Sequence, residues 1–384
     1  MKIVHIVRQF NPSVGGLEAS VLNLAQVQRS RLAIDASVVT LDRIFGHDEI
    51  LPHEDIVAGI PVRRLGWSGS SRYPLAPSVL RHLRESDVVH VHAIDFFFDF
   101  LALTRPFHQR RMIASTHGGF FHSTYFTPLK KLWFNTISRA SILAYHRIVA
   151  CSHSDAALFQ GLAGRRLRLI ENGIDQARFA NSASPQQNRI IMCFGRFAKH
   201  KRIAELFPLL AELRKSDASW RLIVAGRDAD QTAEELTAFA KEAGVADAVS
   251  FIMNPKDAEL TELIGKASYF ACLSGYEGFG LAAVEAMSAG LFPILSDIPP
   301  FRRLIEQSKV GLIVDPAAPM AAAQAVRESV LDDPGAYEAR RENIMDAVRR
   351  YDWEEVAARY SEIYVDAIGE KQGNTTAESM GSHA

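Results

Sequence analysis

Residues 273–290 read LSGYEGFGLAAVEAMSAG, and this stretch decides the fold class. An apolar run that ends at Leu273 predicts a buried strand, and the apolar spacing that follows predicts a helix beginning near Phe279. Gly278 and Gly280 allow backbone to approach a ligand closely, and a helix N-terminus offers free N–H groups to an anion. A strand that leads through such a turn into a helix is typical of the repeating units of a parallel sheet.

The same alternation of apolar runs and helix-like segments extends along the whole chain. The apolar runs lie at 2–7, 36–41, 62–65, 88–91, 112–115, 148–151 and 167–170, and then at 189–194, 221–225, 249–252, 269–273, 292–295 and 311–314. This order predicts an α/β protein with parallel sheets and helices on both faces. Since 384 residues exceed the usual size of a single core, two doubly wound domains are expected.

A polar stretch at 181–188, NSASPQQN, interrupts the apolar rhythm and indicates the boundary between the two domains. We therefore expect an N-terminal domain over 1–175 and a C-terminal domain over 189–350. Apolar residues at helical spacing predict a last helix over 351–368. The residues after it, 369–384, are polar and are expected to form a disordered tail.

Composition excludes several classes of protein. Hydrophobic residues make up 48% and charged residues 23% of the chain, a balance typical of globular proteins. The three cysteines are far apart in the sequence, which argues against a disulfide framework and against a cysteine zinc site. The most apolar stretch, 94–103, contains two aspartates and is much shorter than the roughly 20 residues of a membrane-spanning helix. No secretory signal is recognised at the start, so a soluble or peripheral protein of a reducing compartment is expected.

The charge is unevenly distributed between the two halves. Residues 1–180 carry 21 lysines and arginines against 14 acidic residues, a net +7, whereas 181–384 carry a net −8. A basic N-terminal half favours an anionic partner. The alternative is a chance partition over two solvated surfaces.

Two further loops follow predicted strands and contain candidate binding residues. Residues 194–202 read FGRFAKHKR, which places Lys201 at the predicted start of a helix. A cation there is unfavourable beside the positive end of the helix dipole, so its presence indicates a bound anion that it neutralises. The alternative is a solvated basic loop. Near the N-terminus, NPSVGGLE at 11–18 places Gly16 at the opening of another predicted helix. The pattern is not G-x-G-x-x-G, so a dinucleotide fingerprint is absent.

Histidines lie on or just beyond two predicted strands. His90 and His92 would share one face of a strand, but no third ligand follows at a spacing that a metal site would use, so no metal is predicted. His117 follows the next strand, where open α/β sheets place ligand contacts, although a loop histidine held by a hydrogen bond is the alternative. Asp228 and Asp230 form a D-x-D that we interpret as helix capping rather than as a metal site.

Taken together, these motifs resemble the retaining family-4 glycosyltransferases of GT-B fold. The resemblance rests on Glu277 and Glu285 within the opening stretch, on GRFAKHK at 195–201, on ENGID at 171–175 and on the early glycine pair, and it covers about 1–368. Closer similarity is to bacterial exopolysaccharide mannosyltransferases of xanthan and acetan type. It lies in VRQFNPSVGGLE at 7–18, in SSRYPLAPSVL at 70–80, in VVHVHAIDFFFDFLA at 88–102 and in STHGGFFH at 115–122.

The resemblance implies two Rossmann-like domains facing a cleft, with the helix at 351–368 crossing back to the N-terminal domain. The N-terminal domain would bind the acceptor and the C-terminal domain the nucleotide sugar. The implied reaction moves mannose from GDP-mannose to a cellobiosyl lipid, a polyprenyl-diphosphate-linked oligosaccharide, with retention of configuration and without a metal. The implied location is the inner face of the bacterial cytoplasmic membrane, as a peripheral protein.

The resemblance also implies roles for individual residues. Glu277 would hold the hydroxyls of the donor sugar, and Glu285 would contact the ribose. Arg196 and Lys201 would neutralise the leaving diphosphate. The remaining implied site residues are His117 at the reacting centre, Gly16 in the first loop, the amides of Gly278, Phe279 and Gly280, and Ser152 as a possible lining residue. One departure from the family pattern is FIMN at 251–254, where many relatives have a glycine.

Three alternatives remain open. The first is a transferase of the same family that uses a UDP-sugar and another glycan acceptor. The second is a non-transferring GT-B enzyme such as a sugar-nucleotide epimerase or a phosphorylase. The third, a catalytically silent binding module, is disfavoured because the charged motif residues are all present.

A separate prediction concerns the membrane. Residues 119–134, GFFHSTYFTPLKKLWF, combine aromatic and basic side chains in a way suited to an interfacial helix. Lys130 and Lys131 would contact anionic lipid beside Trp133 and Phe134. The alternative is that these two aromatic residues pack into the core.

Overall fold

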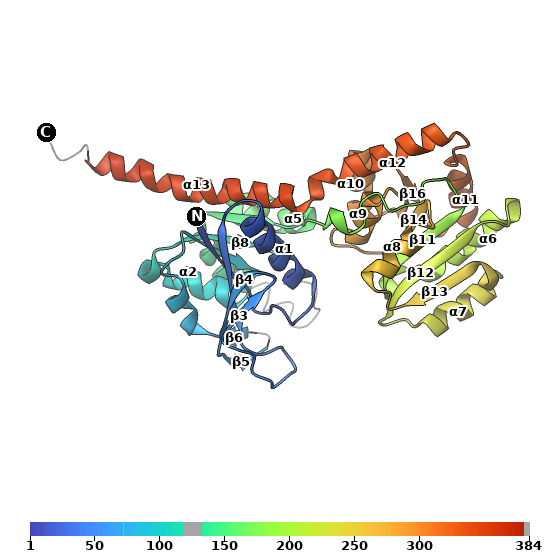
Figure 1. The fold of residues 1–384 in the computed structure, drawn as a ribbon. Coiled ribbons are helices and arrows are strands. Elements are labelled where there is room, and N and C mark those ends of the chain that lie inside the picture. The colour runs from blue at the N-terminus through green and yellow to red at the C-terminus, as the bar shows by residue number, and fades with distance from the viewer. Residues whose placement is uncertain (72, 118–132, 380–384) are drawn as a thin grey trace. The chain divides into compact units, whose positions relative to one another are not determined.

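The computed structural model describes residues 1–71, 73–117 and 133–379, and it divides into two units. The first unit contains Met1–Gly173 together with Trp353–Ala384, and the second contains Ile174–Asp352 (Figure 1). Each unit has its own sheet, parallel except at one edge of the first, and its own hydrophobic core. The chain therefore leaves the first unit once and returns to it at the last helix.

The first unit is built on an eight-stranded sheet in the order β10-β9-β8-β7-β1-β2-β4-β3. Its strands are β1 (Lys2–Ile6), β2 (Asp35–Leu41), β3 (Glu54–Val57), β4 (Ile60–Leu65), β7 (Val88–His92), β8 (Arg111–Ser115), β9 (Arg147–Ala150) and β10 (Leu167–Leu169), and β5 (Ser68–Ser70) and β6 (Tyr73–Leu75) form a separate hairpin. Its helices are α1 (Gly16–Ser30), α2 (Phe96–His108), α4 (Arg139–Ile142), α5 (His153–Ala163) and α13 (Trp353–Ser379).

Every strand predicted for this half is present, but the sequence did not predict β3 or the hairpin. Strand β3 pairs antiparallel with β4 at the edge of the sheet, whereas the other pairs are parallel. Its first residues, Glu54 and Asp55, are exposed, so it has no apolar run by which it could be recognised. Backbone pairing at a sheet edge needs no buried face.

Helix α13 completes the core of the first unit. Val356, Tyr360 and Tyr364 on α13 are buried in one cluster with Ile3 of β1 and Val88 of β7. The helical backbone continues to Ser379, whereas a disordered tail was predicted from residue 369. The segment contains no proline, and a glycine within a helix costs only about 1 kcal/mol, so nothing in the sequence ends the helix at that point.

The second unit is built on a six-stranded, wholly parallel sheet in the order β13-β12-β11-β14-β15-β16. Its strands are β11 (Ile190–Phe197), β12 (Arg221–Asp228), β13 (Val249–Met253), β14 (Tyr269–Cys272), β15 (Phe292–Ser296) and β16 (Leu312–Val314). Its helices are α6 (Leu206–Ser216), α7 (Ala233–Glu242), α8 (Asp257–Ile264), α9 (Leu281–Ser288), α10 (Pro299–Ser308), α11 (Pro319–Glu328) and α12 (Pro334–Val348). All six strands predicted for this half are present.

The polar stretch at 181–188 is a packed part of the second unit rather than a free linker. Ala183 is buried in the core of that unit, and the Asn181 side chain accepts a hydrogen bond of 2.5 Å from Arg341. The division between the units lies earlier, at Gly173 and Ile174. The predicted end of the N-terminal domain, at residue 175, is close to this division, whereas the predicted start of the C-terminal domain, at residue 189, is too late.

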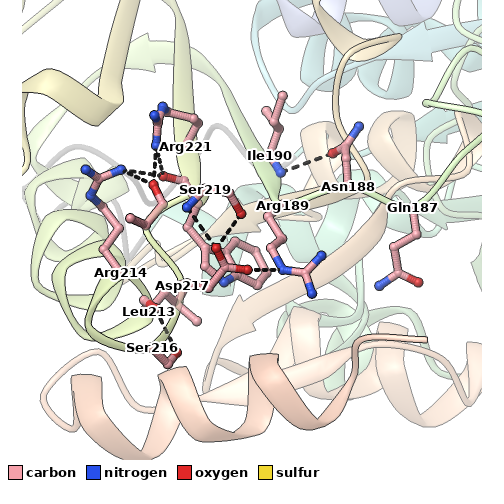
Figure 2. Close-up of polar contacts among 12 residues, drawn as sticks. Gln187, Asn188, Arg189, Ile190, Leu213, Arg214, Ser216, Asp217, Ser219 and Arg221 are labelled. Carbon is pink, nitrogen blue, oxygen red and sulfur yellow. Dashed lines mark hydrogen bonds and ion pairs between the residues drawn. The ribbon is translucent and has the colours of Figure 1, made fainter. Parts of the chain in front are cut away.

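Polar contacts hold the amino ends of β11 and β12 (Figure 2). The Asn188 side chain accepts from the Ile190 amide at 3.1 Å, and Arg189 pairs with Asp217 at 2.5 Å. Asp217 also accepts from the amide and the hydroxyl of Ser219. These contacts lie at the amino edge of the sheet. The loops that contain the predicted site residues follow β11 and β14, and therefore lie at the carboxyl edge.

Candidate functional site

The predicted residues of the second unit gather where the sheet changes direction. Strands β11 and β14 are neighbours, and the chain continues from β11 toward β12 on one side and from β14 toward β15 on the other. In open α/β sheets, ligands bind at the carboxyl ends of the strands at such a switch point. The loop after β11 contains Lys201, and the loop after β14 contains Glu277, Gly278 and Gly280.

Lys201 and Glu277 form an ion pair across these two loops. The Lys201 Nζ donates to Glu277 Oε1 at 2.5 Å, and the Ser274 hydroxyl donates to the same oxygen at 2.7 Å. The two side chains are only 20% and 13% exposed. Burial alone would lower the pKa of Lys201, but the charge and hydrogen bond of Glu277 raise it above its ordinary value. The pair is therefore a charged one.

A close backbone contact holds the two loops together. The Gly275 amide donates to the His200 carbonyl at 2.7 Å, and a Cβ at Gly275 would lie 2.8 Å from Nε of Arg202. A larger residue at 275 would require the Arg202 side chain to move. Ser274 and Gly275 were not predicted as site residues, although both lie in the opening stretch.

The helix expected to begin at Lys201 begins later. Residues Lys199–Lys201 and Ile203–Glu205 form two short 3₁₀ turns, and α6 starts only at Leu206. Arg202 between the turns has φ +50°, a left-handed conformation that interrupts the helix. The prediction that Lys201 opposes a helix dipole was therefore wrong, and its buried partner Glu277 is what distinguishes it.

The turn before α9 is defined by Gly280. The helix begins at Leu281 rather than near Phe279, because Gly280 has φ +91° and is the N-cap residue. A Cβ at Gly280 would lie 2.7 Å from the Phe301 ring, whereas a Cβ at Gly278 would meet nothing within 4 Å. Gly280 is thus required by the fold of the turn, and Gly278 leaves open space beside the Glu277 loop.

Glu285 lies on α9 and has a partner that the sequence did not indicate. Its carboxylate is 3.3 Å from Arg178, and Arg178 also pairs with Asp257 at 2.5 Å. Burial raises the pKa of Glu285, and the positive charge of Arg178 opposes that rise. Arg178 lies three residues after the end of the ENGID run, so its position near that motif was the available signal. Arg196, at the end of β11, is exposed and pairs with no acidic residue in the described part of the chain.

In the first unit, His117 lies just beyond β8, and its partly buried ring is hydrogen-bonded. Its Nε2 is 3.0 Å from Nδ1 of His92, and Nε2 of His92 is 2.9 Å from Nδ1 of His5. Burial lowers the pKa of both His117 and His5 to about 4. These rings are therefore neutral at pH 7.

The sequence did not predict that a third histidine joins His90 and His92. His5 pairs in register with His90 across β1 and β7, and the three rings have nitrogen atoms within 4.8 Å of one another. All six ring nitrogens already have hydrogen-bond partners, since His5 also bonds Gln28 and His90 bonds Tyr364 and Ser115. A metal ion at this position would have to replace those bonds.

Asp228 and Asp230 both accept backbone hydrogen bonds. Asp228 accepts from the Ala233 amide at 2.9 Å, and Asp230 accepts from the Lys199 amide at 3.0 Å. The N-cap of α7 is Thr232, so Asp228 supports the start of that helix from outside the cap position and Asp230 is not in its first turn. Asp230 instead supports the loop that contains Lys201.

The two remaining predicted residues of the first unit are Gly16 and Ser152. Gly16 is the first residue of α1, and a Cβ there would meet nothing within 4 Å, so the space in front of it is open. Ser152 is the N-cap of α5, where its hydroxyl accepts from the Asp155 amide at 3.1 Å. Capping alone explains a serine at 152.

Most of the segment predicted to contact a membrane, 119–134, lies outside the described residues. At its end, Phe134 is only 4% exposed and packs edge-on against Phe159. Trp133 donates to Asp99 at 3.0 Å. These two aromatic residues pack inside the first unit, so the prediction that they enter lipid was wrong. Across the described residues, no helix combines the length and apolarity needed to span a bilayer.

Comparison with known proteins gives matches over most of the chain. The family model "Glycosyltransferase Family 4" matches residues 14–178, and "Glycosyl transferases group 1" matches 175–349. A GDP-mannose:cellobiosyl-diphosphopolyprenol alpha-mannosyltransferase of Komagataeibacter xylinus is 54% identical, covering 96% of this chain and 94% of its own length. The protein of that name from Xanthomonas oryzae is 48% identical, with 96% and 98% covered. The solved sucrose-phosphate synthase of Thermosynechococcus elongatus shares the fold, with a TM-score of 0.68 at 18% identity over 96% of this chain and 99% of its own.

Proposed function

We infer the function of this chain from its family, because it belongs to the family-4 glycosyltransferases and has their GT-B fold. It is a retaining α-mannosyltransferase that moves mannose from GDP-mannose to a cellobiosyl-diphosphopolyprenol lipid. The observation that carries this assignment is 54% identity over 96% of the chain to a mannosyltransferase of that name. The geometry of the second unit gives the assignment a chemical basis.

The Lys201–Glu277 pair offers the two kinds of group that a sugar nucleotide requires. A diphosphate needs cations, and Lys201 together with the exposed Arg196 provides them at the carboxyl edge of β11. Sugar hydroxyls need acceptors, and the Glu277 carboxylate provides one at the carboxyl edge of β14. The amides of Gly278, Phe279 and Gly280 lie directly before α9, where backbone N–H groups can bind a phosphate.

The proposed reaction breaks the bond between the anomeric carbon of mannose and the β-phosphate oxygen of GDP. A hydroxyl oxygen of the acceptor forms the new bond on the same face of the sugar, and its proton passes to an oxygen of the departing phosphate. The protein holds the two substrates in position and stabilises the charge that develops on the diphosphate. In this scheme His117 contacts the mannose, Glu285 contacts the ribose, and Gly16 leaves room for the diphosphate.

We propose that no divalent metal is required. Two cationic side chains and a helix N-terminus can together stabilise a leaving diphosphate. Activity in EDTA tests this directly: turnover should be unchanged. Loss of turnover that Mg²⁺ or Mn²⁺ restores would overturn the proposal and would make Asp228 and Asp230 candidate ligands.

We propose a location on the inner face of the cytoplasmic membrane, as a peripheral protein, because the acceptor is anchored there by its polyprenyl chain. The net +7 of residues 1–180 favours attraction to anionic lipid. The aromatic pair Trp133 and Phe134, which packs within the first unit, has no part in this proposed attraction.

A panel of donors tests the function. GDP-mannose, GDP-glucose, UDP-glucose and UDP-galactose, each radiolabelled, are incubated with the protein and a synthetic cellobiosyl-diphosphate lipid. We expect label in the lipid only from GDP-mannose, and an α-linkage in the product by NMR. Preferential labelling from a UDP-sugar would favour the alternative donor, and a changed sugar nucleotide without any labelled lipid would favour an epimerase.

A further inference from the structure

A row of hydrogen-bonded side chains runs through the core of the first unit and ends at His117. Its members are Gln28 on α1, His5 on β1, His92 on β7, and His117 after β8, and we call them the histidine row. The bonds are 2.7 Å from His5 Nε2 to Gln28 Oε1, 2.9 Å from His5 Nδ1 to His92 Nε2, and 3.0 Å from His92 Nδ1 to His117 Nε2. Gln28, His5 and His92 are fully buried.

The direction of these bonds follows from the amide at one end. The Gln28 carbonyl oxygen can only accept, so Nε2 of His5 must carry a proton. Burial lowers the pKa of His5 to about 4, so its ring is neutral, has one proton, and accepts at Nδ1. His92 must therefore donate from Nε2, and because burial also lowers its pKa it accepts at Nδ1. His117 then donates from Nε2 and has a lone pair, not a proton, at Nδ1.

The Gln28 amide also makes a hydrogen bond on its other side. Its Nε2 donates to the Tyr364 hydroxyl of α13 at 3.2 Å, and that hydroxyl lies 2.8 Å from Nδ1 of His90. The amide thus presents its oxygen to His5 and its nitrogen to Tyr364. A reversed amide would reverse every bond of the histidine row, so one buried glutamine decides the tautomer of a histidine three bonds away.

Within the described residues, Nδ1 of His117 has no hydrogen-bond partner. A polar, partly buried lone pair is most stable when it accepts from a donor such as a hydroxyl. We propose that the histidine row holds His117 as the Nε2–H tautomer, so that Nδ1 accepts a hydrogen bond from a hydroxyl of the bound mannose, and that Gln28, His5 and His92 are positioning residues for this contact. The proposal rests on the proposed function only in naming mannose as the source of the hydroxyl.

The test uses Gln28→Leu, with Gln28→Glu as its matched control. Leucine removes the acceptor for Nε2–H of His5. His5 is then more stable with its proton on Nδ1, from which it can donate to His92. Every bond of the histidine row is then reversed, which places a proton on Nδ1 of His117. Glutamate keeps an acceptor at the same position and should preserve the row. Ring nitrogen NMR on protein labelled with ¹⁵N-histidine reports the tautomer directly, and a His117→Gln spectrum identifies the His117 signals. We expect unprotonated Nδ1 in the wild type and in Gln28→Glu, and protonated Nδ1 in Gln28→Leu.

A kinetic measurement separates positioning from simple support of the core. The donors are GDP-mannose and its 3-, 4- and 6-deoxyfluoro analogues, since fluorine cannot donate a hydrogen bond. In the wild type one analogue should lose about tenfold in kcat/KM relative to GDP-mannose, the scale of one lost hydrogen bond. In Gln28→Leu that difference should disappear, while turnover of GDP-mannose itself falls by about tenfold. His90→Leu, equally buried on β7 but outside the row, should leave the difference unchanged.

Three results would overturn the proposal. They are a proton on Nδ1 of His117 in the wild type, a His117 tautomer unchanged by Gln28→Leu, or no fluorinated analogue that the two proteins treat differently. The NMR measurement needs no turnover. A wild type that does not transfer mannose would therefore contradict the proposed function, while the NMR spectra would still show whether the histidine row sets the tautomer of His117. Should Gln28→Leu not fold, His5→Leu removes the acceptor for His92 and is measured in its place.

Discussion

The two glutamates of the opening motif have different surroundings, which the sequence alone did not distinguish. Glu277 bonds Lys201 and Ser274 in a loop, and Glu285 pairs with Arg178 on a helix. The resemblance to the family indicated that both were site residues, but it could not name partners that lie in other parts of the chain. Lys201 was found through its family motif, whereas Ser274 and Arg178 became visible only when the loops were brought together.

Glu277 is expected to contribute mainly to the chemical step. Glu277→Ala should lower kcat by about two orders of magnitude, since it removes a carboxylate that meets the sugar as charge develops. Ser274→Ala, which removes a neighbouring hydrogen bond and keeps the ion pair, should cost about tenfold or less. Both values come from steady-state mannosyl transfer, with melting curves as a control for folding. Near-normal turnover in Glu277→Ala would remove Glu277 from the active site.

Lys201 is expected to act on the diphosphate, and binding of GDP isolates that role. Lys201→Ala removes the cation closest to Glu277 and should weaken GDP binding by tenfold or more, on the scale of a charge-assisted hydrogen bond of about 1.5–3 kcal/mol. Isothermal calorimetry with GDP measures this without any acceptor. An unchanged dissociation constant would show that the diphosphate binds elsewhere.

At the scale of elements, two glycines of one turn should respond differently to the same substitution. Gly280→Ala places a Cβ at φ +91° and against Phe301, so it should destabilise the protein by about 1–3 kcal/mol. Gly278→Ala meets no atom within 4 Å and should leave stability nearly unchanged. Urea unfolding of the two variants gives the comparison. Equal losses of stability would mean that the turn before α9 is not shaped by Gly280.

Apolar runs in the sequence were sufficient to predict thirteen strands, but not the elements that lack such a run. Strand β3 is exposed, and the start of α9 depends on the backbone conformation of Gly280, which no apolar pattern encodes. The meeting of His5 with His90 and His92 depends on the register of β1 against β7. Such contacts arise from strand pairing between distant segments, so local sequence patterns cannot predict them.

At the scale of the whole molecule, buried neutral histidines connect stability to pH. Burial lowers the pKa of His5 and His117 to about 4, and those of His90 and His92 are also well below the ordinary value. The unfolded chain therefore binds more protons than the folded one below about pH 6.5. The contribution of these histidines to the free energy of unfolding should be fully present above that pH and should fall as the pH drops toward 4.

Urea unfolding at pH 7.5 and pH 5 measures this dependence. Buried carboxyl groups act in the opposite sense and offset part of this loss, because burial raises their pKa values, to about 6 for Asp95 and above the ordinary value for Asp99, Glu205 and Glu285. His92→Gln should reduce the loss of stability on acidification, and His47→Gln, at an exposed position, should not. An equal loss of stability on acidification in the wild type and in His92→Gln would contradict the neutral, buried state of His92.

Only the first part of the last helix, α13, should be needed for the stability of the first unit. A chain that ends at Ile368 keeps the buried residues of α13 and should melt within about 2 °C of the full chain. A chain that ends at Asp352 loses Val356, Tyr360 and Tyr364 from the core of the first unit. Limited proteolysis should then cut Met1–Gly173 rapidly and leave the second unit intact. Equal resistance of the two truncated chains would show that α13 adds nothing to the first unit.

The return of the chain to its first unit also sets the order in which a newly made molecule can fold. During translation, β1 to β10 leave the ribosome long before α13, so the face of the sheet formed by Ile3, Val88 and Ile113 lacks the cover of α13 until the second unit has been synthesised. The second unit is continuous in sequence and can fold as soon as Asp352 emerges. Domains made first usually fold first, but here the domain begun first is the last to be finished. Throughout that interval its apolar surface is open to chaperones, which makes the nascent chain, rather than the finished enzyme, the stage most exposed to aggregation.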